Sequence, residues 1–176
     1  MIRRWWIAGV LLIAGVAAFS AIGANSRPAS EQILPSPLLY RQAPALQGQS
    51  LAGSGQISLA SFRGRFVLVN YFASWCTSCA AEMPQLAKLA RSGTVAVLGV
   101  DYDDQASSAR SFLARYGAAY PVIEDPTGQN SVRWGVSAPP ESFLVAPDGV
   151  VIAKIVGATS LSVVSDLVQL AKSKGY

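Results

Sequence analysis

The chain contains no histidine, and only two of its 176 residues are cysteines, Cys76 and Cys79. The missing histidine removes the commonest protein ligand of transition metals and the usual general base of enzymes. Two thiols alone cannot supply the four ligands of a structural zinc site. The sequence therefore predicts no metal centre and directs attention to the chemistry of the two cysteines themselves.

Charge is also sparse, and it is nearly balanced outside the N-terminus. The chain has 14 basic and 10 acidic residues and a formal net charge of +4. Three of the basic residues, Arg3, Arg4 and Arg27, precede residue 28, so the remainder has 11 basic and 10 acidic residues. Because no basic stripe is present, the sequence predicts no nucleic-acid partner. The length suits one ordinary domain.

An uncharged run of 20 residues, Trp5 to Ala24, follows Arg3 and Arg4. As a helix rising about 1.5 Å per residue it would be about 30 Å long, the thickness of a bilayer core. The preceding arginines favour a cytoplasmic N-terminus, so residues 1–26 predict a single-pass anchor in a bacterial inner membrane. A cleaved signal peptide is the alternative, and it also exports the domain. Both place the domain in the periplasm, where cysteine pairs oxidise unless a donor reduces them.

Residues 27–44 are rich in Pro, Ser and Gln and predict a linker, followed by one domain over residues 45–176. In that domain, buried apolar strands alternate with helical patterns, which predicts an α/β fold with helices on both faces of a sheet. The expected order is a strand over 65–72, a helix ending at Gly93, a strand over 94–100, a helix over 103–117 with an acidic first turn, a strand over 120–125, a short helix over 126–135, a hairpin over 141–157, and a last helix capped by Ser160.

The cysteine pair follows the first of these strands. Cys76 should stand at the first turn of the next helix, where free N–H groups and the helix dipole stabilise a thiolate, so it is the predicted nucleophile. Cys79, one turn further on, can resolve a mixed disulfide, and Trp75 could shield the pair. A structural staple and a two-thiolate Cu(I) site are the alternatives. The strand, the Cys-x-x-Cys and the helix in succession favour redox chemistry.

Five further residues could support this chemistry. Glu82 lies three residues after the second cysteine on the same side of the helix, and its carboxylate is the candidate for proton transfer if burial raises its pKa. An ordinary exposed charge is the alternative. Asn70 lies under the site by strand geometry and could form a hydrogen bond there. Pro84 should kink the helix, and the Pro139–Pro140 bond could be cis or part of a plain rigid turn.

Together these segments resemble the thioredoxin-like family. The resemblance runs from about Leu38 to the C-terminus and rests on FVLVNYFASWCTSC, AEMP, GVDYDD and WGVSAPPESFLVAPDG. The last segment is similar to the Gly-Val-x-Gly-Ala-Pro-Glu-Thr-Phe-Leu segment of the membrane-tethered CcmG/DsbE group of cytochrome c biogenesis, to which TlpA and ResA are related. The resemblance implies a three-layer α/β/α sandwich with a mixed central sheet, preceded by a single N-terminal transmembrane helix.

The resemblance also assigns roles to individual residues. Cys76 and Cys79 match the nucleophile and the resolving cysteine. The other matches are the helix-kinking proline at Pro84, the cis-proline at Pro140, an acid near the active site at Glu82, and the acid after the cis-proline at Glu141. Pro139 departs from the pattern, because it replaces a small residue whose backbone pairs with an extended client and it lacks the N–H for one such bond. Pro139, Pro140 and Glu141 are the predicted docking site.

The implied function is that of a membrane-anchored periplasmic thiol:disulfide oxidoreductase that reduces client proteins through the cysteine pair, without another cofactor. The implied client is apocytochrome c with an oxidised Cys-x-x-Cys-His segment. The implied electron donor is an inner-membrane thiol protein of the DsbD or CcdA type. Other extracytoplasmic clients, such as a copper-site assembly or cell-envelope protein, stay open, as do a Cu(I)-binding module and a disulfide-forming oxidase.

Overall fold

The computed structural model describes residues 33–53 and 55–176. The predicted anchor over residues 1–26 and the first part of the predicted linker lie outside these residues. Among the helices of the described part, none has both the length and the apolar character that crossing a bilayer requires.

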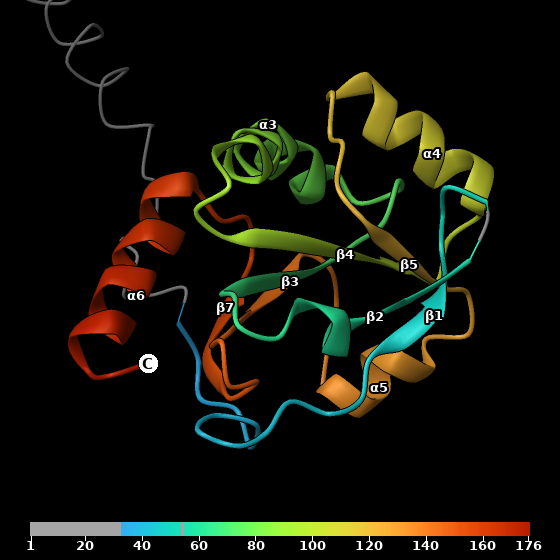
Figure 1. The fold of residues 1–176 in the computed structure, drawn as a ribbon. Helices are drawn as coiled ribbons and strands as arrows, with labels where there is room; N and C mark the ends of the chain where they lie inside the picture. Colours follow the sequence, from blue (N-terminus) through green and yellow to red (C-terminus); the bar gives the residue numbers. More distant parts are fainter. Residues whose placement is uncertain (1–32, 54) are drawn as a thin grey trace, which may run out of the picture. The chain divides into compact units, whose positions relative to one another are not determined.

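A mixed sheet of five strands forms the centre of the domain, in the order β5-β4-β3-β6-β7 (Figure 1). The strands are β3 (Val67–Phe72), β4 (Ala96–Tyr102), β5 (Val122–Asp125), β6 (Glu141–Val145) and β7 (Val151–Val156). The first three are parallel, whereas β6 is antiparallel to β3 and to β7. Every residue of β3 is buried, because this strand is central and is covered on both faces. The predicted mixed sheet and its final hairpin are confirmed.

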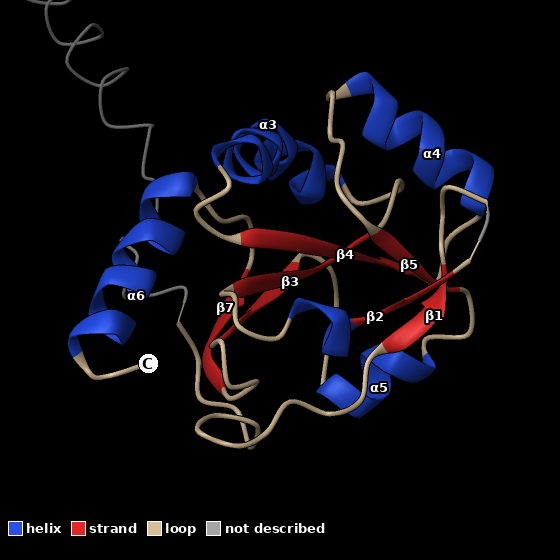
Figure 2. Ribbon diagram, viewed as in Figure 1, coloured by secondary structure: helices blue, strands red, loops and turns tan. Residues whose placement is uncertain are grey.

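Helices cover both faces of the sheet (Figure 2). They are α3 (Thr77–Ser92), α4 (Ala106–Arg115), α5 (Gln129–Trp134) and α6 (Leu161–Ser173). Apolar side chains of α3, α4 and α6 pack in one core with Leu68 and Phe72 of β3, whereas Trp134 of α5 packs in a second core with Tyr71. Alternate residues of β3 thus enter different cores, as the two-residue period of a strand requires. The result is the expected three-layer arrangement.

Two segments outside the main sheet cover its edges. On the β5 side, the N–H of Leu51 donates to the carbonyl of Val122 over 2.9 Å. On the β7 side, residues 33–43 run along the strand, and the N–H of Leu34 donates to the carbonyl of Lys154 over 3.1 Å. The first segment belongs to a small antiparallel unit made of β1 (Gln47–Gln49) and β2 (Gln56–Ser58), which the 3-10 helix η1 (Leu59–Phe62) follows.

Two helix boundaries show how local chemistry decides where a helix begins and ends. The helix α3 runs through Pro84, which lies on its exposed side, and ends as predicted at Gly93, whose left-handed φ of 68° suits glycine. The acidic first turn predicted for α4 is wrong, because Asp103 and Asp104 precede the helix. The Asp104 carboxylate accepts the backbone N–H of Ser74 over 2.6 Å, and this bond holds it in the loop before α4.

Phe143 should be a sensitive test of the second core. Its ring lies 5.1 Å from that of Trp134 and 6.0 Å from that of Tyr71, measured between centroids. The Phe143→Ala variant should lower the free energy of unfolding by about 3–5 kcal/mol, because a cavity replaces the ring. Denaturant titration measures this loss. The control Val132→Ala, at a position 78% exposed, should change stability by less than about 0.5 kcal/mol. Equal effects of the two variants would contradict the packing described here.

Candidate active site

The two cysteines form a disulfide at the N-terminus of α3. Cys76 is the N-cap residue, and its Sγ accepts the backbone N–H of Cys79 over 3.1 Å. This N–H group and the helix dipole favour negative charge on the Cys76 sulfur once the pair is reduced. Cys76 retains 6% of its surface whereas Cys79 is fully buried. Cys76 is therefore the more accessible of the two cysteines, and its role as nucleophile stays a prediction.

The segment 135–140, here called the cis-proline loop, faces the disulfide from the start of β6. Its Pro139–Pro140 peptide bond is cis. The Pro139 carbonyl oxygen lies 3.4 Å from Cys76 Sγ. A disulfide sulfur has no proton to donate, so this is a contact in the oxidised state, whereas a reduced Cys76 thiol can donate to the same oxygen. The Pro140 carbonyl accepts the N–H of Gly157 over 2.9 Å, which ties the loop to the segment before α6.

Glu82 is buried beneath this region, with 1% of its surface exposed. One carboxyl oxygen accepts the side-chain amide of Asn70 over 2.8 Å, and the other accepts the backbone N–H of Thr159 over 2.9 Å. Burial raises the pKa of Glu82 to about 7, although the two hydrogen bonds act in the opposite direction. A carboxyl group that titrates near neutrality can take up and return a proton. The residue is thus not an exposed helix charge, and proton transfer stays its predicted role.

Asn70 connects three elements of the site. Its Nδ2 group donates to Glu82 in α3 and also to Ser142 Oγ in β6 over 3.0 Å. The sequence did not indicate Ser142 or Thr159, because they lie 72 residues from Asn70 and 77 residues from Glu82, respectively. No local pattern spans such distances. Ser142 becomes a candidate only when β6 is known to pair with β3.

Two aspartates, Asp103 and Asp104, lie close to the residues that precede Cys76. The Trp75 side chain is 58% exposed and donates its indole N–H to the carbonyl of Asp103 over 3.2 Å. Asp104, on the same loop, holds the N–H of Ser74. Together these four residues line an open hollow beside the cysteine pair. Trp75 therefore contributes an exposed aromatic surface, and the adjacent aspartates give the hollow a negative charge.

Asp101 is a second buried acid in this part of the molecule, with 2% of its surface exposed at the end of β4. Burial raises its pKa to about 7, and the negative charge of Asp104 acts in the same direction. In the sequence it looks like the first residue after an apolar strand. Only the register of β4 against β3, which places it opposite Phe72, shows that it is still inside the sheet.

Glu141 lies on the other face of the sheet, and 3% of its surface is exposed. Its Oε2 atom pairs with Lys154 Nζ at 2.8 Å, and its Oε1 atom accepts the backbone N–H of Ser137 over 3.2 Å. Because side chains alternate along β6, Ser142 turns toward Asn70 whereas Glu141 turns away from it. The structure thus separates the Glu141 carboxylate from the disulfide and places it behind the cis-proline loop.

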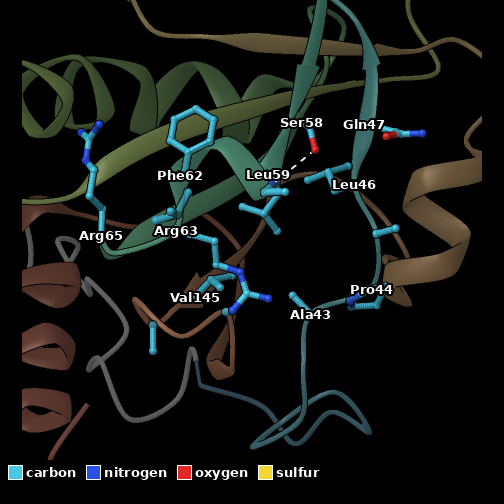
Figure 3. A pocket seen from close by; sticks show the side chains of 15 residues that line it. Ala43, Pro44, Leu46, Gln47, Ser58, Leu59, Phe62, Arg63, Arg65 and Val145 are labelled. Carbon is cyan, nitrogen blue, oxygen red and sulfur yellow. Dashed lines mark hydrogen bonds between the residues drawn. The ribbon is translucent and has the colours of Figure 1, made fainter.

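A cavity of about 320 Å³ lies elsewhere, between residues 43–47, η1 and the β6–β7 turn (Figure 3). Its wall includes Leu46, Phe62 and Arg63, and the disulfide does not line it. The Arg63 guanidinium donates to Gln42 Oε1 over 3.0 Å and to the carbonyl of Asp148, so it is held by its surroundings. The cavity is therefore separate from the redox pair, of which only Cys76 retains some exposed surface.

A Cys-x-x-Cys disulfide at a helix N-terminus, facing a cis-proline beside the inner strands of a mixed α/β/α sandwich, defines a thioredoxin-like thiol:disulfide oxidoreductase. Residues 39–154 match the AhpC/TSA family. The chain belongs to this family and to its thiol:disulfide interchange proteins of the DsbE type. The family resemblance and the enzyme class predicted from the sequence are confirmed.

Individual relatives are named as thiol:disulfide interchange proteins. The chain is 41% identical over 111 residues to the thiol:disulfide interchange protein CycY of Rhizobium leguminosarum bv. viciae, a match that covers 62% of this chain and 60% of CycY. It is 37% identical over 126 residues to a DsbE homolog of Paracoccus denitrificans, covering 70% and 69% of the two chains. A solved thioredoxin-family thiol:disulfide interchange protein of Chlorobium tepidum TLS shares the fold, with a TM-score of 0.67, 24% identity, and coverage of 78% and 99%.

The buried carboxyl of Glu82 should make stability depend on pH. Because its pKa rises from 4.5 to about 7 on folding, its contribution is fully present below about pH 4.5 and is lost as pH rises through about 7. We expect the wild type to lose on the order of 3 kcal/mol relative to Glu82→Gln across this range. Denaturant titrations of the two oxidised proteins at pH 4.5 to 8 measure the difference in their free energies of unfolding. The contribution of Asp101 to the pH dependence is the same in both proteins and cancels in this difference.

The exposed acid Asp166 in α6 supplies the control. The variant Asp166→Asn should follow the wild-type pH profile. A constant difference between wild type and Glu82→Gln across the whole pH range would show that Glu82 does not titrate there.

Proposed function

We propose that the protein is a membrane-anchored, extracytoplasmic reductant of client protein disulfides, and that its client is oxidised apocytochrome c. The thiol:disulfide interchange class follows from the family and the cysteine pair. The anchor follows from the apolar run at residues 5–24. The similarity of residues 134–149 to the corresponding segment of the CcmG/DsbE group supports the choice of client.

The acidic residues near the disulfide support the proposed direction of electron transfer, from the reduced pair to the client. A cation next to the nucleophile would stabilise its thiolate, and hence the reduced form, which makes a pair more oxidising. Here Asp103 and Asp104 lie on the adjacent loop, and Glu82 lies in the same helix. These acids act against the helix N-terminus, which stabilises the Cys76 thiolate. By disfavouring the thiolate they favour the disulfide, so the reduced pair gives up its electrons more readily.

The reaction proceeds by two exchanges. The Cys76 thiolate attacks one sulfur of the client disulfide, an S–S bond forms between Cys76 and the client, and the other client sulfur leaves as a thiolate that takes up a proton. Cys79 then loses its proton to a base, for which Glu82 is the candidate, and attacks Cys76 Sγ. The second client sulfur leaves and is protonated in turn. Two electrons have passed to the client, and the enzyme holds the disulfide seen in the structure.

The enzyme must then be reduced again. The disulfide between Cys76 and Cys79 needs two electrons and two protons, which a dithiol protein can supply by the same two exchanges in reverse. We assign this step to an inner-membrane donor of the DsbD or CcdA type. The exposed side of Cys76 serves both the donor and the client, so the two partners use the site in turn.

The reduction potential of the cysteine pair tests the direction of transfer. Equilibration of the purified chain with a redox buffer, followed by Trp75 fluorescence, should give a value near thioredoxin's roughly −270 mV. A value near DsbA's roughly −120 mV would instead make the protein an oxidant and remove the proposed function. Trp75→Phe is the control, because the fluorescence change assigned to the pair should disappear with it.

A trapping experiment tests the client. A peptide that contains an oxidised Cys-x-x-Cys-His segment should be reduced at least about tenfold faster than a length-matched peptide with the same disulfide and scrambled flanks, a difference of about 1.4 kcal/mol in activation free energy. Cys79→Ser should accumulate a peptide adduct that dithiothreitol removes, and Cys76→Ser should form none. Equal rates with the two peptides would refute the apocytochrome assignment and leave the reductant class intact.

A further inference from the structure

A buried ion pair lies behind the cis-proline loop, on the face of the sheet opposite Glu82. Lys154 of β7 and Glu141 of β6 approach to 2.8 Å, and their side chains are only 10% and 3% exposed. The Lys154 ammonium also lies 5.4 Å from the centre of the Phe143 ring. No step of the proposed reaction involves Lys154.

A gain in folding stability does not account for a buried ion pair of this kind. Removing two charges from water costs several kcal/mol per ion, and well-packed apolar residues of similar size often stabilise a fold as well or better. The remaining hydrogen bonds of this pair are informative, because both go to one short segment. Lys154 Nζ donates to the carbonyl of Gly135 over 2.9 Å, and Glu141 Oε1 accepts the N–H of Ser137 over 3.2 Å.

Both contacts fall within the cis-proline loop, which joins the end of α5 to the start of β6. The same loop presents the Pro139 carbonyl 3.4 Å from Cys76 Sγ. A continuous series of contacts therefore leads from Lys154, through the loop backbone, to the redox-active sulfur. Lys154 itself stays on the far side of the sheet and does not touch the disulfide.

We propose that Lys154 is a positioning residue, which together with Glu141 fixes the cis-proline loop at the distance from Cys76 at which a polypeptide disulfide docks. This inference rests on the proposed use of the loop by client proteins. A client backbone needs the loop in place, because extended segments bind by main-chain contacts. A small disulfide such as 5,5′-dithiobis(2-nitrobenzoate) needs only the Cys76 thiolate.

The variant Lys154→Met removes the ammonium and keeps the length of the side chain. Reduced full-length protein would be mixed separately with the oxidised Cys-x-x-Cys-His peptide and with the small disulfide, at a temperature where circular dichroism shows the variant folded. We expect the rate with the peptide to fall about tenfold, since a displaced docking group of this kind costs that much or more. The rate with the small disulfide should stay within about twofold of wild type. The control Lys172→Met, at an exposed position of α6, should change neither rate.

A second variant separates positioning from folding. Lys154→Met leaves Glu141 as a buried, unpaired charge, which destabilises proteins. Lys154→Met combined with Glu141→Gln removes both charges and the bond to Gly135, and it should show the same selective loss with the peptide. A parallel fall of both rates, or an unchanged ratio between them in either variant, would overturn the proposal. The ratio of the peptide rate to the small-disulfide rate can also be measured with the scrambled peptide. The test of Lys154 therefore does not depend on the apocytochrome assignment, and failure of that assignment would be a separate result.

Discussion

Two hydrogen bonds to one carboxyl group hold the active-site end of this domain together. The Asn70 amide and the Thr159 backbone both donate to Glu82, and they join the central strand, the cysteine-bearing helix and the loop before α6. A carboxyl group buried without such partners would carry an uncompensated desolvation penalty. With them, the group stays inside the core and titrates near neutrality. The contact that closes the core is therefore also the one that gives the site its candidate for proton transfer.

The first residues of β6 extend this arrangement to both faces of the sheet. Glu141 faces Lys154 on one side, and Ser142 faces Asn70 on the other, because successive side chains of a strand point in opposite directions. The cis-proline loop precedes them directly. The Pro140 carbonyl of this loop also accepts the N–H of Gly157, which lies two residues before Thr159, the backbone donor to Glu82. Polar networks on the two faces thus meet at the loop that contacts the disulfide.

Local sequence patterns were enough to predict much of the fold and the centre of the site. The apolar run of β3, the cysteines after it and Gly93 at the end of α3 are near one another in the chain, so strand and helix rules suffice to place Cys76 at a helix N-terminus. The partners of the buried charges could not be predicted this way. Lys154 looks like any strand residue until its register is known, and Asp104 looks like a helix-start acid until its bond to Ser74 is seen. The sequence allowed two conformations at Pro139–Pro140, and tertiary structure selects one.

The covering of both sheet edges has a consequence for how the domain meets other polypeptides. Open strand edges recruit unfolded polypeptides and template their aggregation. Here residues 33–43 follow β7, and Leu51 caps β5, so the backbone groups at these margins are already engaged. An extended polypeptide therefore finds these backbone groups occupied and cannot lengthen the sheet at them. The sheet is thereby protected against edge-to-edge association with other chains.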